Sequence, residues 1–136
     1  MSNIDLSSLI TAQSKAEAAR VAAQETLANL RWHHETGGLV LKDGRHVATS
    51  RDSQAQIANA AAGVRAGLIT APLSWKTRQG WTDFTPDALL DMAAQVSAHV
   101  HACFAAERAV DQTIAATPDP AALDLEAAFA AALAAV

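Results

Sequence analysis

The chain has 136 residues, of which 34 are alanine and only 4% are aromatic, with a net charge of −4. A chain of this length suits one domain that buries about two thirds of its unfolded surface. The acidic balance argues against a dedicated nucleic-acid-binding protein, and a single cysteine excludes an intramolecular disulfide framework. The longest wholly apolar run, residues 127–136, has half the length of a membrane span, and the start does not resemble a signal peptide. We therefore expect a soluble, helix-rich protein of a reducing compartment that binds neither nucleic acid nor membranes.

The first 36 residues contain neither glycine nor proline and predict one long helix from Leu6 to Thr36. Ser7 and Ser8 offer N-cap oxygens, and Gly37 with Gly38 predicts its end. Two lines with seven-residue spacing run along this helix: Leu9, Ala16, Ala23 and Leu30, and beside them Leu6, Gln13, Arg20 and Leu27. Large apolar residues lie at the two ends of this seam, and small or polar residues lie in its middle. Because a helix so poor in large apolar residues gains little from burial alone, we expect it to pack against its own domain or against neighbouring copies.

Residues 38–49 change to a strand-like pattern. Asp43-Gly44 predicts a two-residue hairpin turn of type I′, in which both residues adopt a positive φ. Ser50 then predicts the N-cap of a second helix that starts near Arg51. The buried stripe expected for that helix consists of Ile57, Ala61, Val64 and Leu68.

A second hairpin is predicted between residues 73 and 84, with Arg78-Gln79-Gly80 as a three-residue connection. We expect Trp75 and Trp81 to pack across the strand pair, and Trp75 to anchor the hairpin against the helical core.

Thr85 and Pro86 predict the start of a third helix that runs to about Ala116. The last segment, after Thr117, is predicted to be a helix in which Leu123 and Phe129 are the largest apolar residues.

These elements predict an α+β fold that is mainly α, with two short β-hairpins between helices. Along the chain they divide into an N-terminal helix (1–36), an α+β domain (37–117) and an alanine-rich C-terminal helix (118–136).

Histidine and cysteine residues raise the question of a metal site. His33 and His34 are adjacent and therefore point about 100° apart on a helix. His99, Cys103 and Glu107 form a row at four-residue spacing, but no fourth ligand is evident for a zinc ion. We therefore expect no metal.

Catalytic motifs give no positive signal. Cys103 sits in the middle of a predicted helix among apolar neighbours, which favours a small buried group over a reactive thiolate. Gly37-Gly38 follows a helix and precedes a strand, the reverse of a phosphate-binding loop, and no Gly-x-Ser-x-Gly motif occurs. The sequence predicts no catalytic, cofactor-binding or metal-binding residues, no cofactor and no enzymatic activity.

Charge is distributed unevenly along the chain. Residues 37–80 carry a net charge of +4, and the remainder carries −8. This difference fits anion binding or charge-complementary docking between copies, although a solvated surface with charges of both signs is the simpler interpretation. The six bases of the segment are Lys42, Arg45, Arg51, Arg65, Lys76 and Arg78.

Five elements between residues 31 and 117 occur in a recognisable order. They are Glu35-Thr36-Gly37-Gly38-Leu39-Val40-Leu41, Ser50-Arg51-Asp52-Ser53-Gln54-Ala55-Gln56-Ile57, Ser74-Trp75-Lys76-Thr77, Trp81-Thr82-Asp83-Phe84-Thr85 and Ala98-His99-Val100-His101-Ala102-Cys103. This set resembles an uncharacterised domain family of bacteriophages and prophages, which is found at the C-terminal end of tail-fibre-related and other tail proteins.

The resemblance implies a structural component of a phage tail, at or near the tail fibres or baseplate, with a role in host attachment. Such a protein would be made in the bacterial cytoplasm and reside in the virion. Two alternatives stay open: a fibre-assembly chaperone absent from the mature virion, and a small enzyme or ligand-binding module. The resemblance brings no catalytic residues.

The expected partners are other copies of the chain and other tail proteins, with no small-molecule substrate. The helix over residues 6–36 is longer than its neighbouring hairpins can cover, and residues 121–136 contain fourteen apolar residues. Packing of copies around a common axis would bury both segments, and the family analogy favours three-fold packing.

Overall fold

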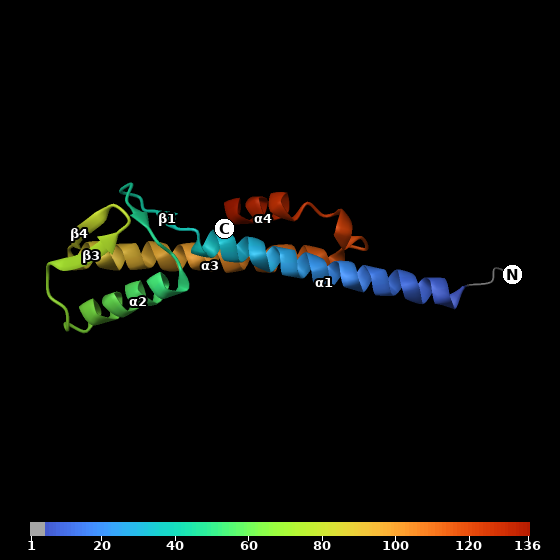
Figure 1. The fold of residues 1–136 in the computed structure, drawn as a ribbon, viewed down its shortest axis with the longest axis horizontal. Coiled ribbons are helices and arrows are strands. Elements are labelled where there is room, and N and C mark those ends of the chain that lie inside the picture. The colour runs from blue at the N-terminus through green and yellow to red at the C-terminus, as the bar shows by residue number, and fades with distance from the viewer. Residues whose placement is uncertain (1–4) are drawn as a thin grey trace. The chain divides into compact units, whose positions relative to one another are not determined.

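The computed structural model of this protein describes residues 5–136 (Figure 1). Within them the order is α1 (Leu6–Thr36), β1 (Leu39–Val40), β2 (His46–Val47), α2 (Arg51–Arg65), β3 (Leu73–Thr77), β4 (Gly80–Phe84), α3 (Pro86–Ala116), a 3₁₀ turn η1 (Pro120–Ala122) and α4 (Leu125–Ala134). The predicted α+β fold, mainly α with two β-hairpins, is confirmed.

Packing groups the chain into two compact units. The first unit comprises residues up to Trp32 together with Phe104–Val136, and the second comprises His33–Cys103. Both long helices, α1 and α3, therefore contribute residues to each unit. The division predicted above, 1–36, 37–117 and 118–136, follows instead the order of elements along the chain.

The ends of the helices follow local capping chemistry. The bounds predicted for α1 are confirmed, but its N-cap is Asp5, whose carboxylate accepts hydrogen bonds from the backbone N–H groups of Ser7 and Ser8 at 3.1 and 3.3 Å. The serines therefore lie in the first turn of the helix, after Leu6, and donate to the cap, because a carboxylate there accepts from orphan backbone N–H groups. Ser50 caps α2 as predicted, through a 3.2 Å bond from the N–H of Ser53.

The first unit is a packed set of helical segments. The fully buried side chains at its centre come from three helices: Leu27 from α1, Ile114 from α3 and Phe129 from α4. The prediction of a continuous helix over 118–136 is wrong, because α4 begins only at Leu125, after Asp124 accepts a hydrogen bond from the N–H of Ala127. Two prolines and this cap break the segment into a 3₁₀ turn followed by a shorter helix.

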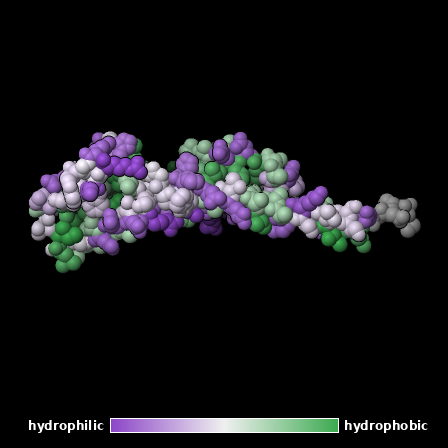
Figure 2. All heavy atoms as spheres, in the orientation of Figure 1, coloured by the Kyte–Doolittle hydropathy of each residue, from purple (hydrophilic) through white to green (hydrophobic). Residues whose placement is uncertain are grey.

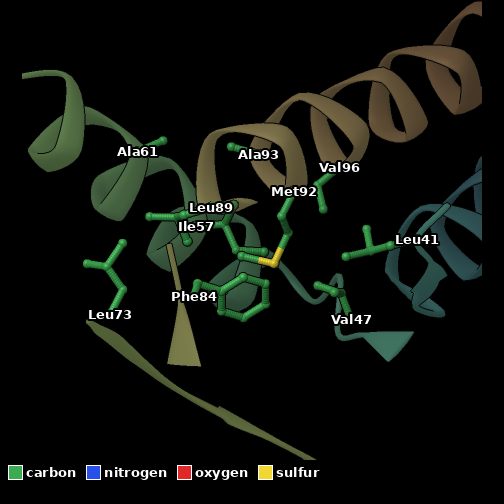
Figure 3. Packing of buried hydrophobic residues seen from close by; sticks show 10 residues of the cluster. All are labelled: Leu41, Val47, Ile57, Ala61, Leu73, Phe84, Leu89, Met92, Ala93 and Val96. Atoms are coloured by element: carbon green, nitrogen blue, oxygen red, sulfur yellow. The ribbon is translucent and has the colours of Figure 1, made fainter. Parts of the chain in front are cut away.

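The second unit has a separate core, in which both hairpins pack against α2 and the first turns of α3. Figure 3 shows Met92 of α3 directed toward the ring of Phe84, with Ile57 of α2 and Val47 of β2 beside them. Leu68, predicted as part of the buried stripe of α2, is 81% exposed. The helix ends at Arg65, so the periodicity that placed Leu68 on the inner face no longer applies there.

The first hairpin differs from the predicted type I′ turn. Only Gly44 has a positive φ, of 88°, and no residue other than glycine has one within residues 5–136. The N–H of Leu41 bonds to the carbonyl of Arg45 at 2.8 Å, while the N–H of Gly44 bonds to the carbonyl of Leu41 at 2.9 Å. The turn is therefore the three-residue type with glycine in the left-handed position, which relieves Asp43 of that conformation.

The second hairpin also corrects two predictions. Thr77 pairs directly with Gly80, so only two residues connect the strands. Trp75 lies opposite Thr82 and packs edge-to-face on Phe84, with 6.4 Å between ring centroids, whereas Trp81 is 73% exposed on the other face. The expected packing of Trp75 on Trp81 is wrong because the observed register puts them on opposite faces of the sheet.

Candidate functional site

The second unit contains an open groove of about 910 Å³. Its walls come from the segment between α1 and β1, from both hairpins and from the start of α2. This volume lies within the range of ligand-binding pockets in proteins. The lining residues are Thr36, Gly37, Gly38, Leu39, Val40, Arg45, His46, Val47, Ala48, Ser50, Ser53, Gln56, Ile57, Trp75, Lys76, Thr77, Arg78, Gln79, Trp81, Thr82 and Phe84.

A stacked cation and two aromatic rings contribute to the lining of this groove. The guanidinium of Arg45 lies 4.2 Å from the centroid of the Phe84 ring, and Trp75 contacts the same ring edge-to-face. Arg45 also forms an ion pair with Asp43 at 2.7 Å. This bond and the backbone N–H of Arg45 hold the pKa of the Asp43 carboxyl below its ordinary value. Because Arg45 comes from one hairpin and Phe84 from the other, the stack joins the two hairpins.

The charged residues in the lining of the groove are basic, although one of them, Arg45, is paired with Asp43 just outside the lining. Arg45, Lys76 and Arg78 line it, with His46 beside them, and none of the described residues that line it is an aspartate or glutamate. Lys76 and Trp81 form a cross-strand pair, in which the ammonium lies 5.9 Å from the centroid of the indole. Because the Trp81 ring is 73% exposed, it contributes little to the core and lies open to solvent beside the Lys76 ammonium.

A buried carboxylate joins the end of α1 to the start of α2, next in sequence to the lining residue Thr36. Glu35 near the end of α1 is fully buried and accepts hydrogen bonds from Arg51 at 2.9 Å and Gln54 at 3.0 Å, both on the first turn of α2. Gln54 also donates to the carbonyl of Thr49 at 2.9 Å. Buried carboxylates are tolerated only when their oxygens are paired in this way. The network therefore fixes the start of α2 against the end of α1.

A buried hydroxyl completes this connection. Thr49 donates to the carbonyl of Glu35 at 2.7 Å and accepts from the N–H of Gly38 at 2.9 Å. Gly38 has a φ of 97°, and a Cβ atom at Gly37 would lie 2.7 Å from the carbonyl oxygen of His33. The two glycines therefore allow the chain to leave α1 sharply, as predicted, and the threonine binds the polar groups exposed by that turn.

The residues considered as metal ligands have separate structural partners. Nε2 of His99 lies 2.9 Å from the carbonyl oxygen of His34, and Cys103 is buried, 1% exposed. Glu107 bonds to Arg31 at 3.0 Å, and that guanidinium lies over the ring of Phe104. Among residues 5–136 no group of three or more histidine, cysteine or acidic side chains is placed to hold a metal ion.

The N-terminal half of α1 presents a second surface. Leu6, Leu9 and Ile10 lie on one face and are 66%, 46% and 61% exposed. Figure 2 shows hydrophobic surface, in green, at the N-terminal end of α1. Arg20, on the seam expected to pack against its own domain or against neighbouring copies, donates to the carbonyl of Thr117 at 2.9 Å and to that of Ile114 at 3.4 Å. It therefore caps the C-terminus of α3 in the same chain.

Sequence reasoning missed the network of Glu35 and Thr49. A glutamate near the end of an exposed-looking helix carries no sign of burial, and no periodic pattern pairs it with residues 14 to 19 positions later. The one available signal was the resemblance, because two of its elements contain Glu35, Arg51 and Gln54. Separately, no helix among the described residues is long and apolar enough to cross a bilayer.

Comparison with known families assigns the chain to an uncharacterised domain family. Residues 18–133 match the family described as "Domain of unknown function (DUF4376)", and the chain belongs to this family. No curated protein matches the chain. No solved structure matches it either. The match includes the groove, the buried network of Glu35 and Thr49, and α4.

Proposed function

We propose that this protein is a structural component of a bacteriophage tail, at or near the tail fibres or baseplate, and that it acts by docking to other proteins. It would be made in the bacterial cytoplasm and incorporated into the virion, where it would serve host attachment. The proposal combines the family resemblance of the five sequence elements with one structural observation, the exposed apolar face on α1.

That face supports docking because it lies on a helix whose other half is already packed in the first unit. Residues 20–32 of α1 pack in the first unit, where Leu27 is buried, and the helix carries the unpartnered leucines beyond that contact. The spacing of Leu6, Leu9 and Ile10 matches one helical face, the pattern by which helices of identical chains associate. We therefore propose that copies of the chain, and neighbouring tail proteins, pack on the N-terminal half of α1.

Light scattering on the purified chain tests the association. The wild-type chain should form an oligomer at about 50 µM, with three copies as the expected number. Leu6→Glu with Ile10→Glu places charges on the apolar face and should give a monomer. Thr11→Glu with Ala18→Glu adds the same charge on the far side of the helix, about 140° away, and should leave the oligomer intact. A monomeric wild-type chain would contradict the proposal.

Mass spectrometry of purified phage particles tests the location and separates the leading proposal from its alternative. A structural component is present in the particles at a fixed ratio to other tail proteins. A fibre-assembly chaperone, the second candidate, is absent from the particles but associates with the fibre protein in the lysate before assembly. An apolar docking face serves either role, so this measurement distinguishes them where the structure alone does not.

A further inference from the structure

We propose that the groove between the two hairpins binds an extended, acidic segment of another polypeptide. The proposal is independent of the phage-tail function and of the apolar face on α1, because it concerns different residues. It rests on the charge of the groove, on the free edges of its strands and on the apolar residues along its floor.

Charge complementarity defines the sign of the ligand. Arg45, Lys76 and Arg78 line the groove, and the described lining residues include no carboxylate, although the whole chain carries a net charge of −4. The start of α2, with Ser50 and Ser53, adds the positive end of a fifteen-residue helix to the same wall. A carboxylate entering the groove therefore meets Lys76, Arg78 and hydrogen-bond donors, together with an Arg45 that it shares with Asp43, whereas a basic segment meets lining residues of its own charge.

The strands define the shape of the ligand. Among residues 5–136 each hairpin forms a separate two-stranded sheet, so each of the four strands has a bonded neighbour within this range on one side only. All four strands contribute lining residues to the groove. Extended peptides bind to such free edges by adding a strand, with main-chain hydrogen bonds for affinity and side-chain pockets for specificity.

The apolar lining residues favour a bound segment in which apolar and acidic residues alternate. Leu39, Val47 and Ile57 contribute to the floor, and the rings of Trp75 and Phe84 contribute to one side. An extended peptide directs alternate side chains to opposite faces. A segment in which apolar and acidic residues alternate can therefore place the apolar ones on this floor and the acidic ones toward the cations at the rim.

A long polyanion such as a nucleic acid fits these observations less well. Nucleic acids bind by neutralising many phosphates along a basic surface, whereas this chain is acidic outside residues 37–80. Free strand edges also offer nothing specific to a nucleic acid or to an anionic sugar, but they match the main chain of a peptide.

A fluorescein-labelled peptide with two repeats of Asp-Val-Glu-Leu serves as the probe, and its binding to the full chain is followed by fluorescence anisotropy. We expect saturable binding with a Kd on the order of 10–100 µM, weakened at higher salt because rim charges are screened. Lys76→Glu with Arg78→Glu should weaken binding at least tenfold. Lys15→Glu with Arg65→Glu changes the net charge equally at positions outside the lining and should weaken it less than threefold.

Two further probes test the ligand class. The same peptide with N-methyl groups on alternate amides should bind at least tenfold more weakly, because it cannot complete a strand. An octathymidylate and an octagalacturonate carry more negative charge than the peptide and should nevertheless bind more weakly. Circular dichroism on every variant verifies that the fold is retained.

Several outcomes would overturn the proposal. If the acidic peptide shows no saturable binding up to about 1 mM, the groove is not a binding site for such peptides. If a peptide with lysine in place of each acid binds equally well, or if both double variants lose the same amount of affinity, the basic side chains at the rim do not determine binding. Unchanged affinity of the N-methylated peptide would exclude strand addition, and tighter binding of the oligonucleotide or the oligouronate would exclude a peptide as the ligand.

Discussion

Replacing Thr49 with valine should destabilise the second unit strongly, although the substitution changes the volume of the side chain very little. The side chain is fully buried, and its hydroxyl makes two hydrogen bonds, to the carbonyl of Glu35 and from the N–H of Gly38. Valine has nearly the same shape, so packing is preserved while both bonds are lost. Leaving a buried backbone group unsatisfied costs about 1–3 kcal/mol, so the free energy of unfolding should fall by about 2–4 kcal/mol.

Thr49→Ser provides the matched comparison. Serine keeps the hydroxyl and loses one methyl group, which costs about 1 kcal/mol when that group is buried. Thr113→Val removes an exposed hydroxyl on α3 whose hydrogen bond to the carbonyl of Ala109 is long, at 3.4 Å. That control should change stability by less than about 0.5 kcal/mol.

Urea denaturation of the three variants, followed by circular dichroism, gives the free energies. In thermal unfolding, Thr49→Val should lower Tm by about 8–16 °C, since each kcal/mol corresponds to about 4 °C for a chain of this size. The reasoning is refuted if Thr49→Val lies within 0.5 kcal/mol of wild type, or if Thr49→Ser is as destabilised as Thr49→Val. The first result would mean that the exit from α1 needs no hydroxyl, and the second that the methyl group alone matters.

Three further predictions concern single side chains. Trp75→Ala should lower the free energy of unfolding, measured in urea, by about 2–3 kcal/mol, because the ring is half-buried against the core. Trp81→Ala should change it little, because that ring is exposed. Equal effects of the two substitutions would contradict the observed strand register. Cys103→Ala should lower the free energy of unfolding by about 1 kcal/mol and leave the oligomeric state in light scattering unchanged, because the thiol is a small buried group. A variant that folds but loses a function would show that the thiol is not merely structural. In an NMR titration the Asp43 carboxyl should have a pKa below 3.8, and Arg45→Ala should raise that pKa. Because the pKa is lower in the folded chain than in the unfolded chain, the stabilisation is present above the unfolded-state pKa and is lost as the pH falls through the folded-state pKa. If the pKa of Asp43 were the same in the Arg45→Ala variant as in the wild type, the guanidinium would be excluded as the cause.

Helices were largely predictable from the sequence because their signals are local. The bounds of α1 and α3 follow from the absence of glycine and proline, from Pro86 at a first helical position and from the paired glycines after Thr36. Local rules also placed the Ser50 cap correctly. They were wrong where two residues compete for one role, as when Asp5 caps α1 in place of the serines that follow it.

The hairpins show where local signals are insufficient. Asp43-Gly44 is compatible with a two-residue and a three-residue turn, and the position of the preceding strand decides between them. In the second hairpin a register shift of one residue moves Trp81 to the opposite face, so its partner could not be inferred from alternation alone. Register depends on packing against the core, which involves residues distant in sequence.

The groove was not predictable for the same reason, although its charge was visible. The excess of bases over residues 37–80 was noted, but it had no location in space, and a solvated surface was the simpler interpretation. The structure places Arg45, Lys76 and Arg78 in the lining of one groove, while Arg65 lies outside it. Clustering in space, and not the count along the chain, is what gives the positive segment a binding interpretation.

The residues that hold the fold together differ from those that carry the two proposals. Glu35 and Thr49 are fully buried and satisfy polar groups where α1 ends, so their replacement should affect stability first. Lys76, Arg78 and Trp81 lie on the exposed rim of the groove and contribute little to the core. Variants at the rim should therefore fold normally and differ only in binding. The same separation applies to the apolar face of α1, which makes both docking proposals testable without loss of the fold.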